Sequence, residues 1–138
     1  MRVYNGFDTW DAVRYAETAL NHLFTARSLL KKAKGWSWAD MFGGGLFITL
    51  AKRNRMKEAE NELDQARIYI NKMLAEIEDS SKFDYIRFND SDALVFTDYL
   101  FDNVITDIIV QQKIDEILEE VDSTIYKVEA IKQKLYDM

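Results

Sequence analysis

Apolar residues recur at alternating intervals of four and three along the first third of the chain, which is the spacing of one face of an α-helix. The pattern predicts a helix that begins at Asp8 or Thr9, where Asp8 can cap the first turn, and that ends before Gly35. Alanines recur at seven-residue intervals, so we expect a neighbouring helix to approach closely. The seam consists of Ala12, Ala16, Ala19, Leu23, Ala26, Leu30 and Ala33, and it is widened by Val13, Leu20, Phe24 and Leu29.

A second segment, from about Leu46 to Asp79, has an even stricter pattern. A helix of this length spans about 50 Å at 1.5 Å per residue. Its seven-residue repeat predicts left-handed, coiled-coil-like packing. The repeat is carried by Met56, Leu63, Ile70 and Ile77, with Ala59, Ala66 and Met73 between them.

The third pattern predicts a helix from about residue 93 to residue 136, roughly 65 Å long. Because this helix is longer than the first, part of its apolar seam has no counterpart within a three-helix bundle. We therefore expect self-association through the third helix, in a homodimer with Val121 and Val128 at the interface. The seam consists of Ile114, Val121, Val128 and Leu135, with Ile117, Thr124 and Ile131 between them.

These patterns predict an all-α fold in which residues 1–138 form a single domain of three long antiparallel helices. The chain has no proline and only five glycines, as expected for few, long, uninterrupted helices. Residues 82–88 are instead rich in strand formers. They lie between the second and third helices, so we expect them at the same end as the N-terminus, where residues 2–4 would pair with them in a small β-ribbon.

The net charge of −6 is unevenly distributed, with +6 on residues 1–57 and −12 on residues 58–138. The simplest use of this asymmetry is internal, with oppositely charged helices lying side by side. The acidic half would repel phosphates, so we expect no nucleic-acid partner.

The chain contains no cysteine, which excludes disulfides, thiol catalysis and cysteine-ligated zinc. Its first residues lack the apolar core of a signal peptide. No run approaches the roughly 20 apolar residues that a membrane-spanning helix needs. We expect a cytoplasmic protein.

Asp98, Asp102 and Thr106 are spaced four residues apart within an apolar stretch, so a helix would stack them on one face. Carboxylates in such surroundings need partners. They could form a ligand or metal site with Lys52 and Arg53. The alternatives are simple exposure or an interhelical ion pair with Arg27, Lys52, Arg53 or Arg55. Metal sites in bundles recruit Glu and His from several helices, and with one histidine and no Glu-x-x-His we expect no metal and no cofactor.

His22 is the single histidine and lies beside the seam of the first helix. We interpret it as a partly buried polar residue with one hydrogen bond, rather than as a base or a pH switch. One histidine with scattered serines does not define a Ser-His-Asp triad. We therefore expect no enzymatic activity.

Residues 35–45 form an aromatic and glycine-rich connection between the first two helices. The three glycines allow the chain to reverse, and neither dinucleotide-binding spacing nor a P-loop is present. The connection would act as a plug or an interaction loop at one end of the bundle. Alternatively, residues 36–48 with the cations that follow would anchor the protein at a membrane surface. The loop residues singled out are Trp36, Trp38, Asp40, Phe42, Gly43, Gly44 and Gly45.

Two stretches resemble those of a group of uncharacterised bacterial all-helical proteins. One is Trp38-Ala39-Asp40-Met41-Phe42-Gly43-Gly44-Gly45, followed by Lys52-Arg53, and the other is Phe96-Thr97-Asp98-Tyr99-Leu100-Phe101-Asp102-Asn103. The resemblance spans residues 36 to about 114. In that group a Lys-His pair follows the glycines, whereas Arg53 takes the place of the histidine here, which puts any site that depends on it in doubt. The resemblance implies a helical fold and no established activity.

We therefore expect a non-enzymatic helical interaction or scaffold protein that self-associates through its third helix and binds a further protein partner. One alternative is a small-ligand or metal-binding bundle that uses Asp98 and Asp102. The other is peripheral association with a membrane surface through residues 36–48.

Overall fold

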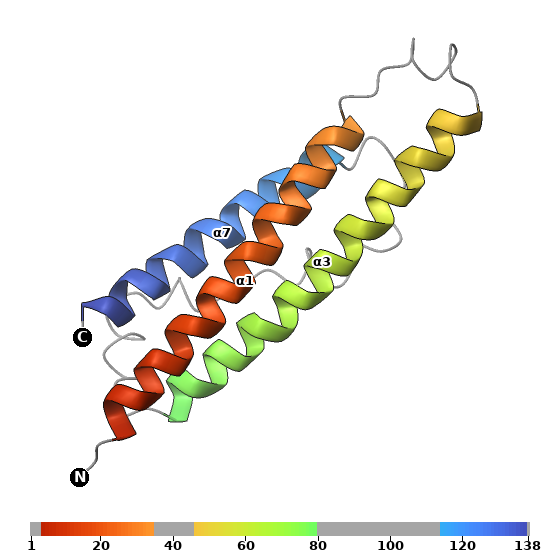
Figure 1. The fold of residues 1–138 in the computed structure, drawn as a ribbon. Helices are drawn as coiled ribbons and strands as arrows, with labels where there is room; N and C mark the ends of the chain where they lie inside the picture. Colours follow the sequence, from red (N-terminus) through yellow and green to blue (C-terminus); the bar gives the residue numbers. More distant parts are fainter. Residues whose placement is uncertain (1–3, 35–45, 80–113, 138) are drawn as a thin grey trace.

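The computed structural model describes residues 4–34, 46–79 and 114–137, and the side chains of residues 10–33, 54–78 and 114–137. These residues form three helices, α1 (Tyr4–Lys34), α3 (Leu46–Asp79) and α7 (Ile114–Tyr136). Helix α1 lies between the other two and packs against both (Figure 1). The all-α fold predicted from the sequence is confirmed.

Contacts between side chains define the direction of α3 relative to α1. His22 of α1 contacts Glu62 of α3, and Tyr15, one repeat earlier on α1, contacts Tyr69, one repeat later on α3. Numbers that rise on one helix while they fall on the other indicate an antiparallel pair.

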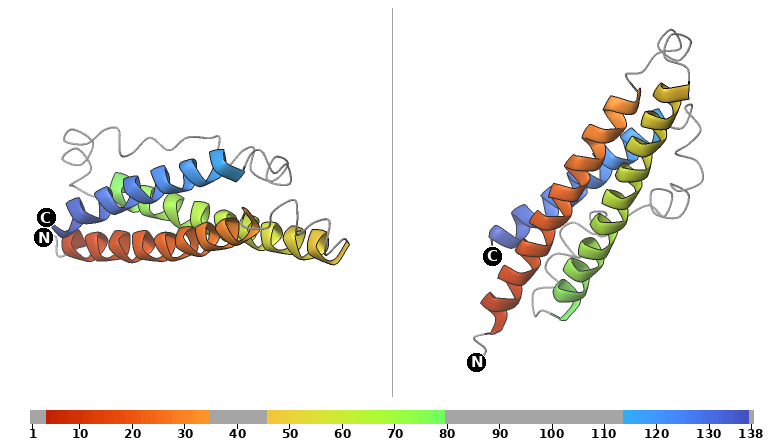
Figure 2. Two further views of the ribbon diagram at one scale, coloured as in Figure 1. Left: turned by 90° about the horizontal axis from the view of Figure 1, so that it is seen from above. Right: turned by 45° about the vertical axis from the view of Figure 1, so that its right-hand side comes forward.

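Helix α7 is antiparallel to α1 as well. Tyr136 contacts Glu17, and Asp122 contacts Arg27. Helices α3 and α7 therefore run parallel to each other, and α7 ends at the end of the bundle where α1 begins (Figure 2). If successive helices had simply alternated in direction, the third helix would have begun at the end of the bundle where α1 begins. Instead, Ile114, the first residue of α7, lies toward the opposite end.

The predicted seam of α1 is buried over its whole length. Most of its members are small alanines, so the backbone can lie close to its neighbours, while Leu23 and Leu30 fill the space between the helices. The members that are at most 1% exposed are Ala12, Ala16, Ala19, Leu23, Ala26, Leu30 and Ala33.

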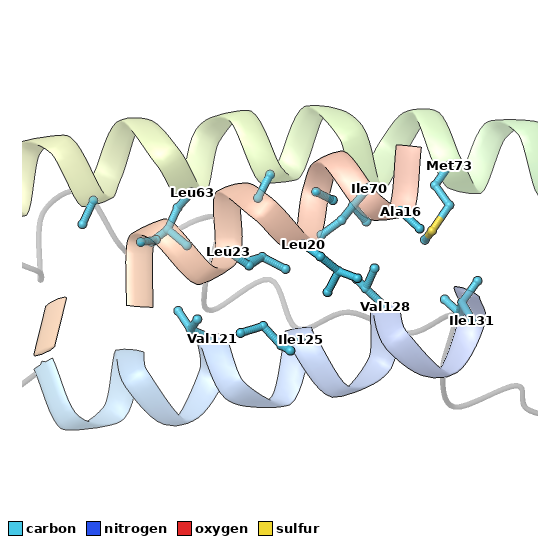
Figure 3. Packing of buried hydrophobic residues seen from close by; sticks show 14 of the residues in the cluster. Ala16, Leu20, Leu23, Leu63, Ile70, Met73, Val121, Ile125, Val128 and Ile131 are labelled. Carbon is cyan, nitrogen blue, oxygen red and sulfur yellow. The ribbon is translucent and has the colours of Figure 1, made fainter. Parts of the chain in front are cut away.

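The seven-residue repeats of α3 and α7 supply the rest of the core. Side chains from both helices point toward α1, and Leu20 and Leu23 of α1 point toward α7 (Figure 3). The buried set on α3 is Met56, Ala59, Leu63, Ala66, Ile70, Met73 and Ile77. The buried set on α7 is Ile114, Ile117, Leu118, Val121, Thr124, Ile125, Val128, Ile131 and Leu135.

Most of the helix ends agree with the predictions. Helix α1 ends at Lys34, directly before Gly35, and α3 and α7 end at Asp79 and Tyr136 as expected. The start of α1 was predicted wrongly, because the helix begins at Tyr4 rather than at Asp8 or Thr9. A single glycine costs a helix interior about 1 kcal/mol, and Gly6 therefore does not stop it. The predicted residues 93–113 of the third helix lie outside the described residues.

The three described ranges contain no strand. Tyr4, assigned to the predicted ribbon, is helical, and the other ribbon residues lie outside those ranges. None of the described helices is long and apolar enough to cross a membrane.

Candidate functional site

The residues singled out from the sequence as a ligand site or interaction loop lie outside the part of the structure that can be described in side-chain detail. Lys52 and Arg53 belong to the first turns of α3, but their side chains are not among those described. The remaining members are Trp36, Trp38, Asp40, Phe42, Gly43, Gly44, Gly45, Asp98, Asp102 and Thr106. The metal and ligand hypotheses for Asp98 and Asp102 therefore remain predictions.

The His22 side chain forms a polar contact between α1 and α3. Its Nδ1 atom lies 2.6 Å from Oε1 of Glu62, and both side chains are roughly 70% buried, with 27% and 30% exposed. An ionised carboxylate only accepts hydrogen bonds, so the ring carries a hydrogen on Nδ1 and donates it. The contact agrees with the interpretation of His22 as a partly buried histidine with a hydrogen-bond partner.

Aromatic rings and a cation surround this hydrogen bond. The His22 ring stacks on Tyr69 with centroids 5.9 Å apart and planes 17° apart, and Tyr15 lies 6.2 Å from Tyr69. The Lys72 ammonium lies 5.1 Å from the centre of the Tyr69 ring and 5.9 Å from that of Tyr15, within cation–π range. These contacts join α1 to α3, so their direct effect is to hold the two helices in register. No group of three or more metal-ligating side chains occurs among the described residues.

A second set of polar contacts joins α1 to α7. The Nε atom of Arg27 donates to Asp122 Oδ1 at 2.7 Å, and the Tyr136 hydroxyl donates to Glu17 Oε2 at 3.2 Å. The hydrogen bond to Glu17 raises the pKa of Tyr136, with further contributions from desolvation and from the negative charge of Glu17. The Arg27–Asp122 pair joins the basic half of the chain to the acidic half, as expected from the charge distribution.

Helix α1 also has an exposed outer face with an aromatic residue at each end and three charged or polar residues between them. Trp10 is 62% exposed and Phe24 is 45% exposed. Arg14, Glu17 and Asn21, also exposed, lie between them at four- and three-residue intervals. We call these five residues the outer face of α1. Phe24 was predicted to widen the buried stripe, and that prediction is wrong, because α3 and α7 cover other sectors of the helix.

Trp10 was not singled out from the sequence. Its spacing of two seven-residue repeats from Phe24 would have placed both side chains on one helix face. This spacing alone does not show whether the shared face is buried or exposed, because only the positions of α3 and α7 define which sectors of α1 remain exposed.

The apolar seam of α7 that was predicted to form a dimer interface packs against α1 of the same chain. Val121 and Val128 are fully buried and face α1 (Figure 3). The expectation that these two valines form the surface for a second chain is therefore wrong, because α1 already covers them.

Comparisons with models of protein families, with curated proteins and with solved structures find no match to this chain. The resemblance to bacterial all-helical proteins rests on residues 38–45 and 96–103, outside the described ranges, and on Lys52 and Arg53. It remains a prediction.

Proposed function

We propose that this protein is a non-enzymatic helical interaction module that binds another protein through the outer face of α1. The observation that carries the proposal is the exposure of Trp10 and Phe24, two large aromatic side chains on one face of one helix. Aromatic residues are enriched at protein interfaces and among the residues that contribute most to binding.

The distribution of polar contacts supports this assignment. His22, Glu62, Arg27 and Asp122 each bridge α1 to a neighbouring helix, so they have a role in holding the bundle together. Trp10 and Phe24 are instead exposed on one face of α1, and aromatic side chains are enriched at interfaces and among the residues that contribute most to binding. The proposal places the protein in the cytoplasm, in keeping with the cysteine-free sequence.

Site-directed photocrosslinking tests this function. We would replace Trp10 or Phe24 with p-benzoylphenylalanine in cells that produce the protein and identify crosslinked adducts by mass spectrometry. Ile68 on α3, which is 42% exposed, provides a matched control position. We expect protein adducts at positions 10 and 24 well above those at position 68. Equal or absent crosslinking at the three positions would overturn the proposal.

Native mass spectrometry of the purified protein adds a second test. We expect masses that correspond to the polypeptide alone or to its protein complexes. A stoichiometric excess that matches an ion or a small molecule would contradict the interaction function and favour the ligand-site hypothesis for Asp98 and Asp102.

A further inference from the structure

We infer that the partner of the outer face is a second copy of this chain, with the two α1 helices packed antiparallel. The inference rests on the proposed function and deepens it by naming the partner and the register. Its basis is that the outer face is complementary to itself, in charge and in the placement of its aromatic side chains.

The α1–α3 pair shows how residues match across an antiparallel contact in this protein. Tyr15 contacts Tyr69, and His22, seven residues later, contacts Glu62, seven residues earlier. Lys72, three residues beyond Tyr69, also lies over Tyr15, so each position reaches residues one turn apart on the facing helix. The same matching applies to any antiparallel pair of helices with seven-residue spacing.

Applied to two copies of α1, this matching gives a symmetric arrangement. Placing Trp10 opposite Phe24 of the second copy also places Phe24 opposite Trp10 of that copy. Both aromatic pairs form together, as a two-fold axis requires. The two Glu17 residues then meet at the axis, and each lies one turn from Arg14 of the facing helix.

The charges at the axis balance in this register. Among the exposed side chains at the axis, the two Arg14 and two Glu17 residues together carry no net charge, so the attraction of each Glu17 to the facing Arg14 offsets the repulsion between the two Glu17 side chains. The Asp11 side chain, which is only 16% exposed, pairs with Arg14 within each chain. Arg14 and Glu17 are exposed and also contact Asp11 and Tyr136 of their own chain, which orients both side chains. The face extends about 21 Å from Trp10 to Phe24 at 1.5 Å per residue, so we expect a small interface and concentration-dependent dimerisation.

Disulfide trapping tests the register directly, because the chain has no cysteine of its own. We would mix a Trp10→Cys variant with a mass-tagged Phe24→Cys variant under mild oxidation. We expect the mixed disulfide to dominate over either homodimer, since equivalent positions 10 lie about 21 Å apart in this arrangement. A dominant position-10 homodimer would indicate parallel pairing and overturn the inference. Tyr126→Cys, at an exposed site on α7, measures random crosslinking.

Charge reversal tests the same interface with the aromatic side chains intact. The mass of the unmodified protein would be followed by analytical ultracentrifugation over a range of concentrations, and we expect a dimer at high concentration. Arg14→Glu and Glu17→Arg should each weaken dimerisation by about tenfold or more, and the double variant should restore it, because the charges then match again. Arg67→Glu, at an exposed site on α3, should leave the mass unchanged.

The outcomes separate this inference from the proposed function. A wild-type protein that stays monomeric at every concentration overturns self-pairing, and so does a double variant that stays as weak as the single variants. If positions 10 and 24 still crosslink to a different protein, the interaction function stands with another partner. If they crosslink to nothing, both proposals fail.

Discussion

At the scale of single residues, the contact between His22 and Glu62 combines two interactions on one imidazole ring. Nδ1 donates to the carboxylate, and the face of the ring stacks on Tyr69. A partly buried hydrogen bond of this kind contributes about 1 kcal/mol to stability. The stacking contribution has to be separated from it by a substitution that keeps the ring.

His22→Phe keeps an aromatic ring against Tyr69 but removes the hydrogen-bond donor, whereas His22→Ala removes both. We expect urea denaturation to show a smaller loss for His22→Phe than for His22→Ala. A double-mutant cycle with Glu62→Ala, which removes the acceptor, should give a coupling of about 1 kcal/mol between His22 and Glu62. A coupling indistinguishable from zero would show that the hydrogen bond contributes nothing to the α1–α3 pair.

Glu60 on α3 lies in surroundings that disfavour its charged form. Burial raises the pKa of its carboxyl above the ordinary value of 4.5, the nearby charge of Asp64 raises it further, and Lys57 lowers it. The folded protein therefore favours the protonated form. The stabilising effect is complete below pH 4.5 and is lost as the pH rises through the folded-state pKa.

Glu60→Gln should accordingly increase stability at pH 7, by about 0.5 kcal/mol or less at this partly exposed site. The advantage should disappear below pH 4.5, where the wild-type carboxyl is protonated. Thermal unfolding at both pH values would measure the difference. Glu58→Gln, at an exposed neighbouring position, is the control. An equal gain for Glu58→Gln would mean that total charge, rather than the environment of Glu60, accounts for the effect.

At the scale of elements, the alanines of α1 set how closely the neighbouring helices approach. Ala19 and Ala26 are fully buried, and they flank Leu23 one turn to either side in the same seam. A tightly packed interior has no room for additional methylene groups at such positions.

Ala19→Leu should therefore lower the free energy of unfolding by about 1–3 kcal/mol, because the larger side chain forces the helices apart or into strained rotamers. Thr25→Leu places the same side chain at an exposed position of α1 and should have little effect. Chemical denaturation monitored by circular dichroism measures both. An Ala19→Leu variant as stable as the Thr25→Leu variant would rule out close packing at this seam.

At the scale of the whole molecule, the direction of α7 determines which surfaces remain available. Because α7 packs antiparallel along α1, Val121 and Val128 are buried against α1 of the same chain. The acidic first half of α7 lies toward the basic C-terminal end of α1, where Asp122 contacts Arg27. The same arrangement leaves Trp10 and Phe24 of α1 exposed.

Val128→Asp distinguishes an intramolecular core from an interface between chains. A carboxylate at this fully buried site should cost about 3 kcal/mol or more and disrupt the folded bundle itself. Ser123→Asp, at an exposed site on the same helix, should be tolerated. Circular dichroism and ultracentrifugation would be recorded together. A Val128→Asp variant that keeps its stability but loses only its oligomeric mass would contradict the packing described for α7.

The sequence by itself determined the main buried seam of each of the three described helices. The repeats through Leu23, Ile70 and Val128 are local, because a helix that follows a three- and four-residue spacing places those side chains on one face wherever it packs. The end of α1 before Gly35 was predictable for the same reason, because a glycine ends a helix through its own backbone conformation and needs no contact with another segment.

Only the tertiary structure decided how these faces meet. The pairing of His22 with Glu62, the direction of α7 and the exposure of Phe24 all depend on register and orientation between segments far apart in the sequence. Periodicity within one helix contains no information on the register of another. For this reason the sequence predicted the buried seams, whereas the assignment of Val121 and Val128 to a dimer interface was wrong and the outer face of α1 was missed.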